Sequence, residues 1–93
     1  MATPEERIRA EIKKIAQGPR SVHFSQIDWV MTHLKTDLNY SVRRFGTNQH
    51  YTYTVGDLKP FQVCDHHPGQ KHLKVGYVKG FLSRMIELGL SED

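Results

Sequence analysis

The stretch from Gln49 to Val55 alternates polar and apolar residues, and this pattern restricts the fold of the chain more than any other feature. In an extended strand successive side chains point to opposite faces, so one side carries Tyr51, Tyr53 and Val55. The polar residues share the other side, and these are Asn48, His50, Thr52 and Thr54. Such a strand suits a sheet that is covered by helices on one face and exposed to solvent on the other. We expect functional side chains on the exposed face.

Two neighbouring segments predict the remaining strands. Residues 39–45 alternate apolar with polar positions, and residues 59–64 place Phe61 and Val63 on one face. Between the second and the third strand, Gly56-Asp57 is typical of a two-residue hairpin turn with glycine in the first position. We therefore expect three strands in an antiparallel meander.

Three segments have the apolar spacing of amphipathic helices. The first covers about residues 4–17, and it follows a capping box in which Thr3 precedes a glutamate by three positions. The second is expected from Ser25, as its cap, to about residue 37, and the third over about residues 73–88. The resulting order is α-α-β-β-β-α, an α+β fold with the helices packed on one face of a three-stranded antiparallel sheet.

Positive charge is concentrated in the second half of the chain. The 93 residues contain 13 Lys and Arg and 10 Asp and Glu. Between Asn39 and Ile86, however, seven basic residues face two acidic ones. This local surplus suits a polyanion such as nucleic acid, although a solvated basic surface has the same composition.

The remaining composition indicates one cytoplasmic domain. A chain of this length forms a single domain, here residues 1–93 with an added N-terminal helix. No apolar run approaches the roughly 20 residues that span a bilayer, and the N-terminus lacks the apolar core of a signal peptide. The single cysteine, Cys64, fits a reducing compartment and is expected to pack as a small apolar residue.

Several short motifs along residues 12–88 occur in the order and spacing of a known family. They are Val22-His23-Phe24-Ser25, Tyr40-x-x-Arg43-x-x-Gly46-Thr47, Tyr51, and Lys71-His72-Leu73-Lys74-x-x-Tyr77-Val78. Together they resemble the HicA family of bacterial toxin-antitoxin systems. The resemblance implies a small ribonuclease (mRNA interferase) with a fold like the double-stranded-RNA-binding domain, and a HicB-like antitoxin protein as its partner.

The chain departs from this family at the catalytic position. In the family the glycine and the Ser or Thr are followed by a catalytic histidine, and Asn48 stands there in this chain. Asparagine does not exchange a proton near neutral pH, so it cannot act as the general base or acid of RNA cleavage. His50 is the nearest replacement and points to the same face, but it lies about 6.6 to 6.8 Å further along the strand. Asn48 and His50 are therefore the candidate catalytic positions of a metal-independent endoribonuclease that needs no cofactor.

The expected RNA contacts are basic and polar residues around the exposed face. The start of the third helix is a favourable place for phosphate, because the helix dipole and the free amides attract anions. The candidate phosphate-binding residues are Arg43, Arg44, Thr47, Lys71, His72 and Lys74.

Two alternatives remain open at this point. On the same fold, the protein could be a catalytically inactive interaction or regulatory module that contacts another protein through the exposed sheet face or the last helix. The segment Asp65-His66-His67, with His72 nearby, has metal-ligand chemistry. Adjacent histidines in a strand point to opposite faces, however, so we interpret the segment as a polar loop and assign it no metal.

Overall fold

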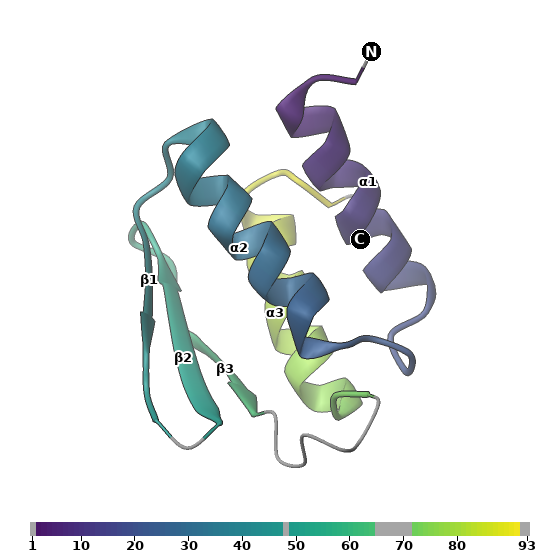
Figure 1. Ribbon diagram of the computed structural model, residues 1–93, viewed down its shortest axis with the longest axis vertical. Helices are drawn as coiled ribbons and strands as arrows, with labels where there is room; N and C mark the ends of the chain where they lie inside the picture. The colour runs from purple at the N-terminus through teal and green to yellow at the C-terminus, as the bar shows by residue number, and fades with distance from the viewer. Residues whose placement is uncertain (1, 48, 65–71, 92–93) are drawn as a thin grey trace.

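The computed structural model describes residues 2–47, 49–64 and 72–91. The elements in this part of the chain are α1 (Pro4–Gln17), α2 (Phe24–Leu38), β1 (Val42–Phe45), β2 (His50–Val55), β3 (Phe61–Cys64) and α3 (Val75–Glu87). The strands form an antiparallel sheet in the order β1-β2-β3, and α2 and α3 lie along the same side of this sheet (Figure 1). The predicted α+β architecture and its element order are confirmed.

The strand register separates the two faces of the sheet as the alternation predicted. On the helix-covered face, Tyr53 pairs with Phe61, and both side chains are buried. On the other face, which we call the open face, His50 pairs with Cys64 and Thr52 with Gln62, because directly opposed residues share a face. The open face also receives Arg43 and Phe45 from β1, opposite Thr54 and Thr52.

The core lies between the sheet and the helices. Tyr53 and Phe61 stack with their ring centroids 5.4 Å apart, and Phe61 meets Phe81 of α3 edge-on at 5.9 Å. Helix α1 adds a further layer, because it packs on α2 and, to a smaller extent, on α3. Its buried face consists of Ile8, Ile12 and Ile15.

Helix α2 begins earlier than expected, because the prediction that Ser25 caps it is wrong. The cap residue is His23. Its backbone N–H donates to Oε1 of Gln26 at 2.8 Å, and the Gln26 N–H donates to the His23 carbonyl at 3.0 Å. These two hydrogen bonds use backbone N–H groups at the start of α2, which the Ser25 hydroxyl was expected to cap.

Strand β1 is shorter than expected for a related reason. Asn39 adopts the left-handed conformation with φ 60°, and the Tyr40 N–H donates to the Leu34 carbonyl at 3.0 Å. These two residues therefore terminate α2, and the strand can begin only at Val42.

The connection between β2 and β3 turns at the predicted residues but is longer than a two-residue hairpin loop. The Leu58 N–H donates to the Val55 carbonyl at 3.1 Å across Gly56, which has φ +53°. Residues 56–60 nevertheless separate the two strands. The Gly56 N–H donates to the Ser41 carbonyl at 2.8 Å and so continues the pairing with β1, while Pro60 has no N–H for the ladder.

The turn between β1 and β2 depends on Gly46. This residue has φ +119°, and a Cβ atom placed on it would lie 1.9 Å from the carbonyl oxygen of His50. The His50 N–H donates to the Thr47 carbonyl at 3.1 Å. Glycine is thus required for the close approach that positions the first residue of β2.

Candidate nucleic-acid interface

Two histidines meet where α2 and α3 begin, and a third stands at the start of β2, at the same end of the molecule. Helices α2 and α3 both begin at this end, where β2 also begins and β3 finishes (Figure 1). The Leu73 N–H donates to the Val22 carbonyl at 2.8 Å and joins the segments that precede the two helices. The rings of His23 and His72 lie 5.1 Å apart. We call this region, with His23, His50 and His72, the histidine end.

Contacts between α2 and β2 complete the histidine end. The ring of Phe24, the first residue of α2, stacks on Tyr51 of β2 with 5.1 Å between the centroids. Tyr51 directly follows His50 in the strand, so the stack holds the start of β2 beside the start of α2. The histidine end is therefore built from elements that pack on one another.

The electrostatics of the histidine end favour an anion. The N-terminus of a helix carries a partial positive charge of about half a unit, and two such termini lie here. Neither α2 nor α3 has an acidic residue in its own first turn, and a carboxylate hydrogen-bonded there, Oε2 of Glu11, accepts from Nε2 of Gln26 at 3.2 Å. Lys74, which is exposed and is the cap residue of α3, adds a full positive charge.

His50 has a cysteine as its neighbour across the strands. Its Nδ1 atom lies 3.2 Å from Sγ of Cys64, and the two residues form a directly opposed pair. The His50 side chain is exposed, whereas Cys64 is buried, as expected, with 5% of its surface accessible. The cysteine thus contacts the imidazole of an exposed histidine, and imidazole is the side chain best suited to proton transfer near neutral pH.

A small recess surrounds this pair. It has a volume of about 90 Å³ and is lined by His50, Tyr51, Thr52, Gln62, Val63, Cys64 and Tyr77. Tyr77 comes from α3, and the other residues come from β2 and β3. The recess therefore supplies an imidazole, a hydroxyl and an amide within one concave surface.

The two arginines of β1 point to opposite faces of the sheet. Arg43 is exposed on the open face, opposite Thr54. Arg44 faces the helices, where its Nη1 atom is 3.1 Å from Oδ1 of Asp28 and its guanidinium lies 5.1 Å from the centre of the Tyr51 ring. Arg43 is therefore available to a ligand on the open face, whereas Arg44 joins β1 to α2.

Asp28 also serves the buried tyrosine of β2. The hydroxyl of Tyr53 donates to Oδ1 of Asp28 at 2.8 Å. Burial, reinforced by this carboxylate, raises the pKa of Tyr53 above its ordinary value. The arrangement of Arg44, Asp28 and Tyr53 fixes the sheet to α2 on the side away from the open face.

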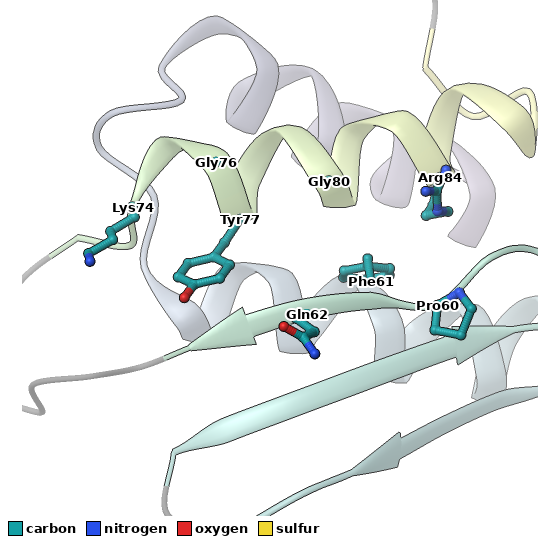
Figure 2. A pocket seen from close by; sticks show the side chains of 8 residues that line it. All are labelled: Pro60, Phe61, Gln62, Lys74, Gly76, Tyr77, Gly80 and Arg84. Atoms are coloured by element: carbon teal, nitrogen blue, oxygen red, sulfur yellow. The ribbon is translucent and has the colours of Figure 1, made fainter.

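A larger groove runs between β3 and α3 (Figure 2). Its volume is about 480 Å³, and its lining residues are Pro60, Phe61, Gln62, Lys74, Gly76, Tyr77, Gly80 and Arg84. Gln62 and Tyr77 also line the recess at His50. The groove and the recess are therefore parts of one continuous surface that begins at the histidine end.

The structure brings some of the predicted site residues together and separates others. His72 and Lys74 both lie at the start of α3, and Thr47 lies in the turn that leads to His50. Arg43 lies further along the open face and Arg44 on the covered face. Asn48, Lys71 and the Asp65-His66-His67 segment lie outside the described residues.

Sequence analysis missed the partners that strand register and helix packing supply. His23 was not expected at the site, and neither Gln62 nor Tyr77 was expected to line a groove. The sequence signal for the groove is the pair Gly76 and Gly80, which lie one helical turn apart on the side of α3 that lines it.

Two absences are established for the described part of the chain. Residues 2–47, 49–64 and 72–91 contain no cluster of three or more His, Cys, Asp or Glu side chains that could hold a metal ion. No helix among these residues is long and apolar enough to cross a membrane.

Comparison with known proteins identifies no relative of this chain. No protein-family model, no curated protein and no solved structure matches the chain.

Proposed function

We propose that the protein binds RNA through the histidine end and the adjoining open face of the sheet. One observation carries this proposal: α2 and α3 begin side by side, without an acidic residue in either first turn, next to His23, His72 and Lys74. Helix N-termini and lysine side chains are effective ligands for phosphate. The described residues of the open face include no acidic side chain that would repel the backbone of a nucleic acid.

The contacts follow from the position of each side chain. Lys74 and His72 bind a phosphate at the start of α3, and Arg43 binds a second phosphate over the open face. Thr47 donates a hydrogen bond from the turn beside His50. Arg44 acts indirectly, since its ion pair with Asp28 holds β1 in place. Lys71, which directly precedes His72, belongs to the proposal on the strength of its sequence position alone.

We carry the resemblance to the HicA family forward as part of this proposal. His50 removes the proton from a ribose 2′-hydroxyl, and the 2′-oxygen attacks the adjacent phosphorus. The bond to the 5′-oxygen breaks, and that oxygen takes up a proton from solvent. The products are a 2′,3′-cyclic phosphate and a free 5′-hydroxyl, and the reaction needs no metal. A cytoplasmic location and a HicB-like antitoxin that covers the histidine end complete the proposal.

The binding step is tested with Lys74→Ala. Removing one phosphate contact should weaken the binding of a short single-stranded RNA and lower the slope of log K against log salt by about 0.7. The matched control is Lys35→Ala, because Lys35 is an exposed lysine in the last turn of α2, at the opposite end of the helix. Filter-binding titrations over a range of KCl concentrations measure both quantities. Equal affinities and slopes for the two variants would show that the histidine end is not the RNA site.

The cleavage step is tested with His50→Ala in the presence of EDTA. We expect this variant to retain RNA binding and to lose cleavage, because the proton acceptor is gone. His33→Ala is the control, since His33 pairs with Asp37 on α2 at 2.7 Å. The readout is the appearance of 2′,3′-cyclic phosphate ends. If the wild-type protein binds RNA without cutting it, and Asn48→His begins to cut, then the residue at position 48 has disarmed the nuclease and His50 is not its replacement.

A further inference from the structure

Apart from Lys74, the residues that line the groove between β3 and α3 have no role in the phosphate contacts proposed above, although the groove opens beside the histidine end. Resting on the RNA-binding function proposed above, we propose that this groove is a subsite for one unpaired nucleobase, so that the protein prefers single-stranded to fully paired RNA. Its volume of about 480 Å³ falls within the range of about 300 to 1,000 Å³ that is typical of small-molecule sites.

The walls of the groove suit a flat aromatic ligand. On the α3 side, Gly76 and Gly80 carry no side chains. A Cβ atom added to Gly76 would meet nothing within 4 Å, and one added to Gly80 would lie 3.8 Å from Cβ of Phe61. At Gly80 a side chain would extend toward Phe61 and take up space in the groove, and at Gly76 the absence of a side chain leaves the mouth of the groove open.

Two side chains offer the contacts that a base needs. The half-buried ring of Tyr77 projects from α3 toward β3, and the exposed amide of Gln62 borders the groove from the open-face side of β3, which is an edge strand (Figure 2). A base can stack on an aromatic ring and form hydrogen bonds through its edge with an amide. Stacking of this kind tolerates any base, so Gln62 is the residue that we expect to discriminate among them.

The charges of the groove match a nucleotide and connect it to the phosphate site. Lys74 and Arg84 are both among the lining residues, and none of the lining residues is acidic. The Arg84 side chain is paired with Glu87, which leaves Lys74 as the cation for the phosphate. Lys74 is also the cap residue of α3 at the histidine end. A phosphate held there places the attached nucleotide at the mouth of the groove.

The occupant has to be unpaired. In a duplex each base is hydrogen-bonded to its partner and stacked between neighbours, and it reaches a protein pocket only if it leaves the helix. The groove lies between a strand edge and a helix, where only a base that is turned outward can enter. This geometry distinguishes the site from one that contacts the phosphates and 2′-hydroxyls of a duplex from outside.

The test compares single-stranded and duplex RNA on variants that fill the groove or leave it open. The probes are a non-self-complementary RNA of about 12 nucleotides and its blunt duplex. In Gly80→Leu a side chain occupies the groove, and in Ser83→Leu the same side chain is placed at an exposed position of α3 that is not in the lining. The wild type and Ser83→Leu should bind the single strand about tenfold more tightly than the duplex, and Gly80→Leu should lose this preference.

A second pair of variants keeps the test decisive if Gly80→Leu fails to fold, which a thermal melt reveals. Tyr77→Ala should lose the single-strand preference, while Tyr77→Phe, which keeps the ring, should retain it. The base subsite is refuted if a folded Gly80→Leu keeps the preference for single-stranded RNA, or if Tyr77→Ala keeps it. Equal binding of both RNAs by the wild type refutes the subsite as well. In each of these cases RNA binding itself still stands. Failure of the wild type to bind either RNA refutes the proposed function and the subsite together.

Discussion

Gly46 shows how one residue without a side chain positions the candidate acid/base group. Its φ of +119° is strained for any other residue, and its Cβ atom would overlap the His50 carbonyl. The Thr47 carbonyl then accepts a hydrogen bond from the His50 N–H, so the turn fixes the position of the first residue of β2. The geometry of His50 is therefore set by the backbone of the turn as well as by its neighbour Cys64.

We expect Gly46→Ala to lower the free energy of unfolding by more than Gly56→Ala does. Both glycines have positive φ, which costs a substituted residue about 1 to 3 kcal/mol. Only at Gly46 does the new Cβ meet backbone atoms, because nothing lies within 4 Å of the corresponding position at Gly56. Urea denaturation of the two variants measures the difference. Equal losses would mean that the β1–β2 turn can relax without cost.

Tyr53 gives the protein a predictable response to alkali. Because the folded state raises the pKa of Tyr53 above the unfolded value of about 10, the neutral phenol is favoured by folding. Its contribution to stability is complete below about pH 10 and is lost as the pH rises beyond it, by at most about 1.4 kcal/mol per pH unit. Tyr53→Phe should cost about 1 kcal/mol at neutral pH, for the hydrogen bond to Asp28, and should flatten the alkaline loss.

Urea denaturation between pH 9 and about pH 12 tests the response to alkali. Tyr40→Phe serves as the control, because Tyr40 is half-buried and lies outside the strands. Its slope should equal that of the wild type. If the alkaline loss is as steep in Tyr53→Phe as in the wild type, other groups cause it.

At the scale of elements, local signals predicted the helices better than the strands. Thr3 and the glutamate at position 6 form the expected capping box, and α1 ends at Gln17, before Gly18. At the start of α2 the sequence predicted Ser25 as the cap, but the structure begins the helix after His23, whose backbone N–H is bonded by the side chain of Gln26. The alternation of polar and apolar residues located the strands. Their ends, however, depend on which backbone N–H and carbonyl groups are already used by the helix caps and turns.

Helix α1 should contribute stability without contributing to the site. Ile12 is buried against α2, with 1% of its surface exposed, and Ile12→Ala should cost about 2 to 5 kcal/mol. Lys13→Ala, at an exposed position in the same helix, should change stability by about 0.5 kcal/mol or less. Urea denaturation measures both. RNA affinity at a temperature where all proteins are folded should be unchanged, and a weaker affinity of Ile12→Ala would mean that α1 supports the site.

At the scale of the whole molecule, the sequence identified the parts of the candidate site that are local and missed those that are assembled. His72 and Lys74 could be predicted because the start of a helix attracts anions wherever it lies. The meeting of His23 with His72, and of Gln62 with Tyr77, depends on the packing of distant segments. No spacing along the chain encodes such contacts, so the groove became visible only in three dimensions.

Because the helices cover only one side of the sheet, the residues that hold the fold together and the residues that can contact a ligand lie largely on opposite faces. Gln62 lies between two buried neighbours and Thr52 next to one, while Arg43 is exposed on β1, so each can be exchanged with little loss of packing. Substitutions at these exposed positions could therefore change the ligand that such a protein binds, or remove a catalytic activity, while the core stays unchanged.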